Sequence, residues 1–393
     1  MQTAQPIYLD YNATTPVDPR VREAMLPYLD QNFGNPSSAH AYGQTAHSAV
    51  ERARMQVAAF LGAHPQEIVF TGGGSEADNL AILGMAFARQ APGAHLVTTA
   101  VEHPAVLQAC HYLQRRHGFT LTVVGVDGRG RVHPDAIRRA LCARTVLVSV
   151  MHAQNEVGTL QPLAEIARYT REHAIPLHVD AAQSAGKVAV NVTTLGADML
   201  AIAGHKLYAP KGVGALYIRS GLQLEPLVHG AGQERGRRAG TENVAGVVAL
   251  GEACALAATE LAAEPARLRR LRNLLWARLA AAVPGLRLHG HQRERLPNTL
   301  NVGIPDVPAA TWLAATPDIA ASTGSACHAG RTDPSPVLLA MGLSPEQAAG
   351  GVRLSIGRFT TEADIIRAAD LLAAAAQRLR ANSAATCPPA DRE

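Results

Sequence analysis

The sequence predicts an α/β protein whose main sheet is mostly parallel. Short segments rich in Val, Ile and Leu, each of strand length, recur between residues 68 and 203. Continuously apolar strands are typical of parallel sheets, which helices cover on both faces. Helical patterns separate these segments, as expected for repeated strand–helix units. With 393 residues and 47% hydrophobic content, the chain can bury a large core without disulfides.

The expected elements of this sheet alternate along the chain. We expect strands at residues 68–70, 95–100, 121–126, 145–150, 175–179 and 199–203. We expect helices at residues 46–61, 76–89 and 163–173, with others beginning near 101, 134 and 243.

Beyond about residue 258 the alternation gives way to long helices. A helix after Pro265 is expected, then strands at 296–303 and around Arg353, and a last helix from Thr361 with Asp364 as its capping-box partner. The sequence therefore predicts a large domain at 17–257, a small α+β domain made of 1–16 and 258–380, and a disordered tail at 381–393.

Charge and composition exclude several classes of protein. The net charge is only +4, and no dense basic block supports a stable nucleic-acid partner. No apolar run approaches 18 residues, and the first residues lack a signal pattern, so no membrane association is expected. The five cysteines are odd in number and lack metal-ligand or C-x-x-C spacing, which favours the reducing cytoplasm and predicts no metal site.

Asp180 and Lys206 are the strongest candidates for chemistry. Asp180 closes one predicted strand and Lys206 follows the next. An acid and a lysine at neighbouring strand ends suit pyridoxal 5'-phosphate: the lysine forms a Schiff base, and the acid keeps the pyridine nitrogen protonated. Only Lys187, Lys206 and Lys211 interrupt an otherwise complete preference for arginine. Lysine, unlike arginine, can lose its proton to become a nucleophile, although Lys187 and Lys211 are equally well explained as surface residues.

A glycine turn is the candidate anion site. Gly72, Gly73 and Gly74 follow a predicted strand, with Ser75 as the expected N-cap of the helix at 76–89. Backbone N–H groups and the helix dipole favour a phosphate at such a place. A plain helix start explains the same residues about as well, since neither a Walker loop nor G-x-G-x-x-G is present.

Polar residues at several strand ends are expected to meet at one sheet edge. These residues are His103, Asn155, Asp180, Gln183, His205 and Lys206. Open α/β sheets bind ligands at that edge. Each residue alone has an ordinary structural explanation, and for Asn12 and its neighbouring threonines we favour a turn.

Two further segments carry candidate residues. Cys327 lies among small and turn-forming residues at 321–336, which indicates an exposed loop and a candidate nucleophile. Arg353 could hold a substrate carboxylate or simply lie at the surface. The glycine- and arginine-rich segment at 230–243 is expected to be mobile or interfacial. Cys110, Cys142 and Cys254 fall in helical patterns and are expected to be packed and inert, whereas Cys387 lies in the predicted tail.

A set of motifs spread over residues 8 to about 361 resembles the cysteine desulfurases, a group within the class V aminotransferase family of fold-type I pyridoxal phosphate enzymes. The motifs are Y-L-D-Y-N-A-T-T-P, F-G-N-P-S-S, T-G-G-G-S-E-A-D-N-L-A, V-E-H, M-H-A-Q-N-E-V-G, H-V-D-A-A-Q-S, G-H-K-L-Y-A-P-K-G-V-G-A-L, R-A-G-T-E-N, S-T-G-S-A-C and R-L-S-I-G-R-F-T.

The resemblance implies a role for each matching residue. Lys206 would carry the cofactor, Asp180 would pair with its ring nitrogen, and His103 would stack on the ring and shuttle protons. Asn155 and Gln183 would contact the ring and its phenolic oxygen. Gly74, Ser75, Ala203, Gly204 and His205 would surround the phosphate. Thr241 would reach the phosphate of the partner subunit, which implies a homodimer. Arg353 with Asn155 would hold the substrate, and Cys327 would become a persulfide.

The resemblance also implies a reaction and partners. L-cysteine would become L-alanine, with sulfur passed to an acceptor or Fe–S scaffold protein for Fe–S cluster or thiocofactor assembly. Two residues depart from the family pattern. Ala203 replaces a Ser or Thr that usually contacts the phosphate, and the Cys327–His328 pair is similar to selenocysteine lyases, so L-selenocysteine is an alternative substrate. A plain class V aminotransferase or a catalytically silent scaffold are further alternatives.

Overall fold

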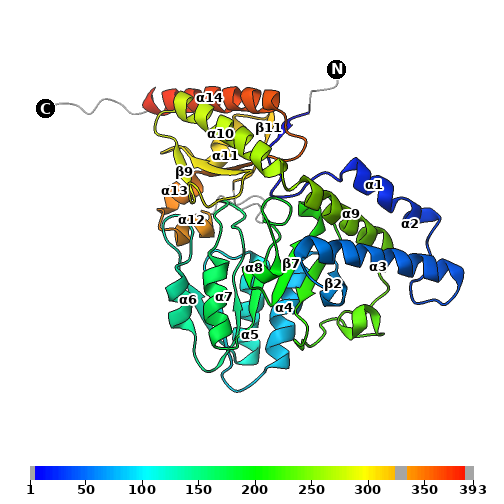
Figure 1. Ribbon diagram of the computed structural model, residues 1–393. Coiled ribbons are helices and arrows are strands. Elements are labelled where there is room, and N and C mark those ends of the chain that lie inside the picture. Colours follow the sequence, from blue (N-terminus) through cyan, green and yellow to red (C-terminus); the bar gives the residue numbers. More distant parts are fainter. Residues whose placement is uncertain (1–4, 324–333, 386–393) are drawn as a thin grey trace.

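A seven-stranded sheet forms the centre of the larger of two lobes (Figure 1). The computed structural model describes residues 5–323 and 334–385. Only β8 runs antiparallel to its neighbours in this sheet, so the predicted mostly parallel α/β architecture is confirmed. In spatial order the strands are β2 (Ile68–Thr71), β8 (Gly214–Ile218), β7 (Met199–Ala203), β6 (Leu177–Asp180), β5 (Thr145–Ser149), β3 (His95–Thr99) and β4 (Thr120–Val124).

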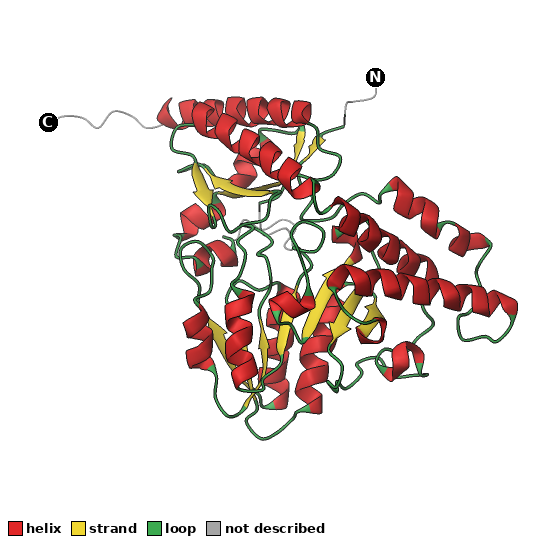
Figure 2. Cartoon of the chain, in the orientation of Figure 1, coloured by secondary structure: helices red, strands yellow, loops and turns green. Residues whose placement is uncertain are grey.

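Helices cover both faces of this sheet, as Figure 2 shows. The inner strands are buried on both sides because successive residues join different cores, whereas the edge strand β4 is partly exposed. In β7, Leu200 and Ile202 belong to one core, whereas Met199 and Ala201 belong to the other. The second core is closed by α4 (Gly74–Ala88) and α5 (Pro104–His117). The first is closed by α3 (Ala41–Leu61), α6 (Pro134–Ala140), α7 (Leu163–Glu172) and α9 (Val244–Glu260). Shorter helices are α1 (Pro19–Met25), α2 (Pro27–Asp30) and α8 (Val192–Leu195).

The small lobe has a separate hydrophobic core, which includes Leu268, Leu271, Leu275 and Leu279 from one face of α10. It contains an antiparallel sheet in the order β12-β10-β9 and a parallel pair of β1 with β11. Its strands are β1 (Ile7–Tyr8), β9 (Arg287–His289), β10 (Thr299–Gly303), β11 (Ile319–Ala320) and β12 (Gly351–Ser355). Its helices are α10 (Glu264–Ala282), α11 (Ala309–Ala314), α12 (Pro336–Ala340), α13 (Pro345–Ala349) and α14 (Glu362–Ala385).

The N-terminal segment connects the two lobes. The backbone of Leu9 bonds to Ala320 and Ser355 in the small lobe, at 2.8 and 2.7 Å. A few residues later, the N–H of Thr15 donates to the carbonyl of His205 at 2.9 Å, beside Lys206. We call residues 12–15 the N-terminal strap. The strap therefore lies between the small lobe and the carboxyl edge of the large sheet.

Three local expectations need correction. Gly73, not Ser75, is the N-cap of α4, so the helix begins at Gly74 and Ser75 lies inside its first turn. Cys142 is exposed and lies after α6, because Leu141 turns to an extended conformation and ends the helix. The last helix, α14, continues to Ala385 and so extends into the predicted tail. In the segment predicted to be mobile or interfacial, Glu234 is buried against Arg54 with an O–N distance of 2.7 Å, and a place at an interface stays a prediction.

Within residues 5–323 and 334–385, no single helix combines the length and the hydrophobicity that a membrane crossing requires. Only α9 and α10 taken together pass that test, across a bend of 77°.

Candidate active site

The predicted site residues of four strands meet at the carboxyl edge of the sheet. Asp180 is the last residue of β6, and Lys206 ends a 3-10 turn directly after β7, the parallel neighbour of β6. His103 precedes α5 and follows β3, and Asn155 lies in the turn after β5. The charges of His103, Asp180 and Lys206 act on one another, so the structure brings these three groups together as expected.

The carboxylate of Asp180 is buried and held in place. Its Oδ1 accepts the N–H of Ala182 at 2.8 Å. Burial raises the pKa of Asp180, while the Ala182 N–H and the nearby charges of His103 and Lys206 oppose the rise. A buried carboxylate is stabilised most by a cationic partner with an N–H to donate. The position of Asp180 therefore suits a protonated pyridine nitrogen.

The orientation of the His103 ring fixes its protonation pattern. Its Nδ1 accepts the N–H of Ala105 at 3.2 Å and so caps the N-terminus of α5. Because Nδ1 serves as an acceptor, the proton of the neutral ring is on Nε2. Burial lowers the pKa of His103, which favours this neutral form. The residue can therefore present an N–H or accept a proton after a small change of environment.

The amine of Lys206 is held by the N-terminal strap. Its Nζ donates to the carbonyls of Asn12 and Ala13, the latter at 2.7 Å. The Asn12 carbonyl also accepts the Nε2 of Gln183 at 2.9 Å. His205 contacts the same strap, with its Nδ1 3.2 Å from the Thr14 hydroxyl. Burial together with Lys206 lowers the pKa of His205 to about 4. These carbonyl acceptors help to keep the Lys206 amine in place.

The start of α4, next to β7, is a candidate anion-binding site because no side chain caps its first N–H groups. No side chain bonds to the first N–H groups of α4, since its N-cap is Gly73, with φ of +153°. A Cβ added to Gly74 would lie 3.0 Å from the Cβ of Ala203, so the helix start is pressed against the end of β7. Gly204 is equally confined, because a Cβ there would lie 2.8 Å from Val213. Free N–H groups at a helix N-terminus fit a phosphate.

Arg353 faces the same edge from the small lobe. Its side chain is 3% exposed, with Nη1 3.2 Å from the Asn155 carbonyl and Nη2 2.8 Å from Asp10 Oδ1. The buried Nε has no hydrogen-bond partner among the described residues. The surface explanation for Arg353 is therefore wrong. A buried guanidinium with an unused N–H suits the carboxylate of an amino acid.

The structure does not place Thr241 at this edge, and it does not describe the position of Cys327. Thr241 is exposed, in the segment before α9, and its predicted contact with a partner subunit stays a prediction. Cys327 lies outside the described residues, as does Cys387. Ser75 is exposed at the start of α4.

Two functional candidates were missed by sequence reasoning. Asn12 is fully buried, and the turn that the sequence favours there is present. Lys187 is also buried and bonds to Asn12 Oδ1 at 3.2 Å and to Gln183 Oε1 at 2.9 Å. The rarity of lysine and the spacing of four residues from Gln183 were the available signals for Lys187.

These donors and acceptors fit pyridoxal 5'-phosphate: an acid for its ring nitrogen, a lysine for its aldehyde and free N–H groups for its phosphate. The fold and the site together define a protein of the fold-type I class. Comparisons with known proteins agree. The profile of the family described as Aminotransferase class-V matches residues 7–367.

Curated relatives place the chain in one group within this family. The chain is 44% identical over 376 residues to "Cysteine desulfurase IscS" of Dictyoglomus turgidum, covering 95% of both chains. It is 45% identical over 376 residues to "Cysteine desulfurase IscS" of Methanosarcina thermophila, covering 95% of this chain and 93% of that one. The chain therefore belongs to the cysteine desulfurases of the class-V aminotransferase family.

Solved structures show the same fold. A NifS-like protein superposes with a TM-score of 0.88 at 35% identity, covering 96% of this chain and 100% of that one. A structure described as "SspA in complex with cysteine" superposes with a TM-score of 0.80 at 37% identity, covering 90% of this chain and 99% of that one.

Proposed function

We propose that this protein converts L-cysteine to L-alanine and receives the sulfur on Cys327 as a persulfide. One observation carries the proposal: Lys206, His103 and Asp180 meet at a single strand edge that Arg353 also faces. A lysine base, a buried acid and a carboxylate-binding arginine are what an amino-acid substrate and pyridoxal 5'-phosphate require.

The chain's residues would hold the cofactor as follows. Asp180 would accept the ring N–H, His103 would lie against the ring, and Asn155 and Gln183 would bond to its polar substituents. The backbone of Gly74 and Ser75, with Ala203, Gly204 and His205, would surround the phosphate. When bound, the cofactor supplies an electron sink for the Cα carbanion. We infer that Thr241 completes the phosphate site of a second subunit, so the active protein is a homodimer.

The steps assigned to the protein are binding, proton transfer and sulfur transfer. Arg353 with Asn155 would hold the substrate carboxylate, because the guanidinium is already buried and fixed. Lys206 Nζ would take the Cα proton, and neutral His103 would move protons at Nε2. The Cys327 thiolate would attack the substrate sulfur, forming an S–S bond while the Cβ–S bond breaks. The balance is cysteine plus a Cys327 thiol giving alanine plus a Cys327 persulfide.

Selenocysteine lyase activity is the second candidate, favoured by the Cys327–His328 pair. Cysteine is supported as substrate by the names of the curated relatives and by the cysteine complex of the structural neighbour. We propose that the sulfur passes to an acceptor or Fe–S scaffold protein for Fe–S cluster or thiocofactor assembly, and that this occurs in the cytoplasm.

We also propose a division into a large cofactor-binding domain at 17–257 and a small domain made of 1–16 and 258–380. Two observations support it. The hydrophobic core of the small lobe includes both Leu9 and α10, and β1 pairs with β11 although more than 300 residues separate them in the sequence.

The decisive experiment measures alanine release from L-cysteine and from L-selenocysteine for the wild type and for Cys327→Ala. We expect turnover of cysteine by the wild type and none by the variant. Turnover of selenocysteine alone, surviving the substitution, would instead identify a selenocysteine lyase. A purified protein that shows no visible cofactor absorbance after incubation with pyridoxal 5'-phosphate would support the silent scaffold.

A further inference from the structure

Lys187 is a buried lysine beside the proposed cofactor site with no assigned role. It lies in the turn after β6, four residues beyond Gln183, and its side chain is shielded from solvent. Its Nζ donates to Gln183 Oε1 at 2.9 Å and to Asn12 Oδ1 at 3.2 Å. Both acceptors are neutral amide oxygens, and neither is a carboxylate.

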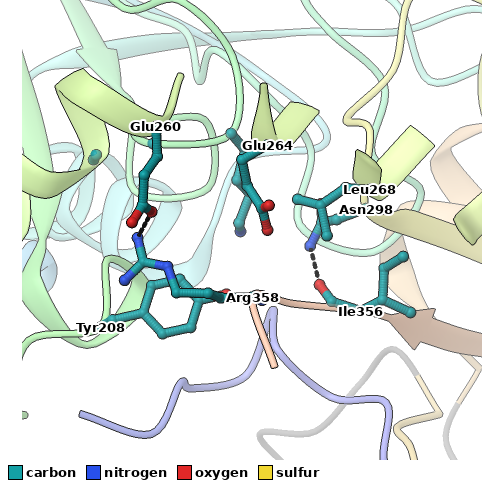
Figure 3. Close-up of a pocket in the computed structure, with 10 residues that line it drawn as sticks. Tyr208, Glu260, Glu264, Leu268, Asn298, Ile356 and Arg358 are labelled. Carbon is teal, nitrogen blue, oxygen red and sulfur yellow. Dashed lines mark hydrogen bonds and ion pairs between the residues drawn. The ribbon is translucent and has the colours of Figure 1, made fainter. Parts of the chain in front are cut away.

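The surroundings do not favour a charged amine. Burial lowers the pKa of Lys187 well below its usual value, and the positive charges of Lys206 and Arg353 act in the same direction. A water-sized pocket of about 20 Å³ borders Lys187 (Figure 3). The two acids that line it are engaged elsewhere: Glu260 with Arg358 at 2.5 Å and Glu264 with Arg267 at 2.7 Å. A buried lysine without an acid partner is costly and needs a reason.

The reason we identify is the direction of two amide groups. Lys187 donates both of its hydrogen bonds from Nζ, which has at least two N–H groups whether the amine is charged or neutral. Oε1 of Gln183 must therefore face Lys187, which turns Nε2 toward the Asn12 carbonyl, 2.9 Å away. That carbonyl is also an acceptor for Lys206. A glutamine without such a neighbour could rotate its amide by half a turn at little energetic difference.

Asn12 is fixed in the same manner. Its Oδ1 accepts from both Lys187 and Asn298, the latter at 3.1 Å. Its Nδ2 must then donate, and it does so to the Thr299 hydroxyl at 2.9 Å and to the Asn155 carbonyl at 3.2 Å. Lys187 thus helps to fix the side-chain amides of Gln183 and Asn12, with both oxygens turned toward its Nζ.

We propose that Lys187 is a positioning residue: by bonding to Gln183 Oε1, it makes Gln183 present its N–H₂ group toward the backbone carbonyl of Asn12, which also holds Lys206, and toward the cofactor site. The inference rests on the proposed function, because it assumes that Gln183 contacts the bound cofactor. Lys187 acts through Gln183 and Asn12 and is not itself assigned a contact with the substrate.

A double-mutant cycle on the dissociation constant of pyridoxal 5'-phosphate tests this proposal. Lys187→Met keeps the length and apolar stem of the side chain but removes every donor, and Gln183→Leu removes the amide. We expect each single variant to raise the dissociation constant by about tenfold, and the double variant to be no worse than the weaker-binding single variant. If instead the two effects multiply, so that the double variant has a dissociation constant roughly a hundredfold above that of the wild type, the proposal is overturned.

Matched variants separate this outcome from general damage. Lys211→Met removes an exposed lysine, and we expect its effect to combine multiplicatively with that of Gln183→Leu. Lys187→Gln keeps a donor and should bind the cofactor at least about threefold more tightly than Lys187→Met. If Lys187→Met does not fold, Lys187→Gln takes its place in the cycle, and multiplicative effects there would equally reject the role.

Cofactor titrations and alanine assays together separate a failure of the proposed function from a failure of the proposed role of Lys187. A wild type that binds no cofactor, or binds it but releases no alanine from cysteine or selenocysteine, contradicts the proposed function. A wild type that binds and turns over, combined with independent effects at Lys187 and Gln183, contradicts only the role of Lys187.

Discussion

Arg353 and Asp10 form an ion pair at the edge of the active site, with Arg353 Nη2 2.8 Å from Asp10 Oδ1. The side chains are 3% and 19% exposed, so water screens the pair only weakly. Asp10 is bridged to Ser355, two residues from Arg353 on the same strand. The proposed substrate-binding arginine is thus aimed by an acid that lies far away in the sequence.

This geometry predicts that Asp10→Asn raises KM for L-cysteine by about three- to tenfold with a smaller change in kcat. The amide cannot hold the guanidinium as firmly, so the fork loses part of its alignment. Steady-state alanine release is the measurement. Arg353→Lys is the comparison variant and should raise KM by about a hundredfold, because lysine has no planar fork. An Asp10→Asn enzyme with wild-type KM would show that the ion pair is irrelevant to substrate binding.

Lys206→Ala should reduce alanine release by about a thousandfold or more while the protein stays folded. The loss reflects removal of the group proposed to transfer the Cα proton. The side chain is only half-buried, so its removal leaves no large cavity. Alanine release and thermal unfolding should be measured on the same preparation. Substantial alanine production by a folded Lys206→Ala protein would exclude the assigned base.

Ala203→Ser should tighten cofactor binding by about tenfold. Ala203 lies against the start of α4, where its Cβ is 3.0 Å from a Cβ built on Gly74. A hydroxyl there could donate to a phosphate oxygen, and a hydrogen bond to a charged group contributes about 1.5 kcal/mol or more. Ala203→Cys is the control, because a thiol has similar size but is a weak donor. Equal dissociation constants for the wild type and Ala203→Ser would count against the phosphate role of this position.

Glu102 predicts a specific dependence of stability on pH. Burial raises the pKa of Glu102 from 4.5 to about 8, against the opposing hydrogen bonds from Thr99 and Met151. The folded chain therefore holds a proton that the unfolded chain has already lost, and the contribution of Glu102 to stability falls as pH rises from about 4.5 to about 8.

Glu102→Gln removes this titration. Relative to the variant, the wild type should lose roughly 3 to 5 kcal/mol of unfolding free energy across that pH range, since one pKa unit corresponds to about 1.4 kcal/mol. Urea unfolding of both proteins at several pH values is the measurement. The variant's altered hydrogen bonds add an offset that does not vary with pH. A difference that stays constant over the range would mean that Glu102 ionises normally.

Cys142 should be the reactive thiol among the three described cysteines. It is exposed, and the Thr145 hydroxyl, 3.5 Å from its sulfur, lowers its pKa. Cys110 and Cys254 are buried, and burial raises the pKa of Cys110 to about 12. In a variant that also carries Cys327→Ser and Cys387→Ser, we expect Cys142 to be alkylated at least about a hundredfold faster than Cys110 or Cys254.

Mass spectrometry of the alkylated Cys327→Ser/Cys387→Ser protein would identify the modified cysteine. Thr145→Val should slow its alkylation, because the hydrogen bond that stabilises the thiolate is lost. Labelling of Cys110 or Cys254 at the same rate as Cys142 would contradict the burial of these two thiols.

The sequence predicted the large sheet well because its strands are short, apolar and separated by helices. The pattern at β6 and β7, with Asp180 and Lys206 at their ends, also predicted where the site lies. Parallel strands end at the same edge, so their neighbouring side chains follow from topology alone.

The parts that could not be predicted depend on contacts between distant segments. Lys187 bonds to Asn12 only after the strap has docked, and the rarity of lysine and the spacing from Gln183 do not by themselves indicate that Lys187 is buried. The same applies to Glu234, whose buried pairing with Arg54 fastens a segment of glycine and arginine that looks mobile. Cys142 was wrongly placed because the helical pattern continues one turn beyond the true end of α6.

The N-terminal strap has a consequence for the order in which the active site is assembled during synthesis. Asn12 bonds to Ser355 across 343 positions of sequence, and its carbonyl helps to hold Lys206. A ribosome must therefore release nearly the whole chain before the residues made first can reach their final partners. The large sheet can form earlier. In a nascent chain halted before β12, however, the strap would lack its bond to Ser355 and would not be fixed beside Lys206. We expect the cofactor to be captured tightly only after release, so that unfinished chains do not sequester it.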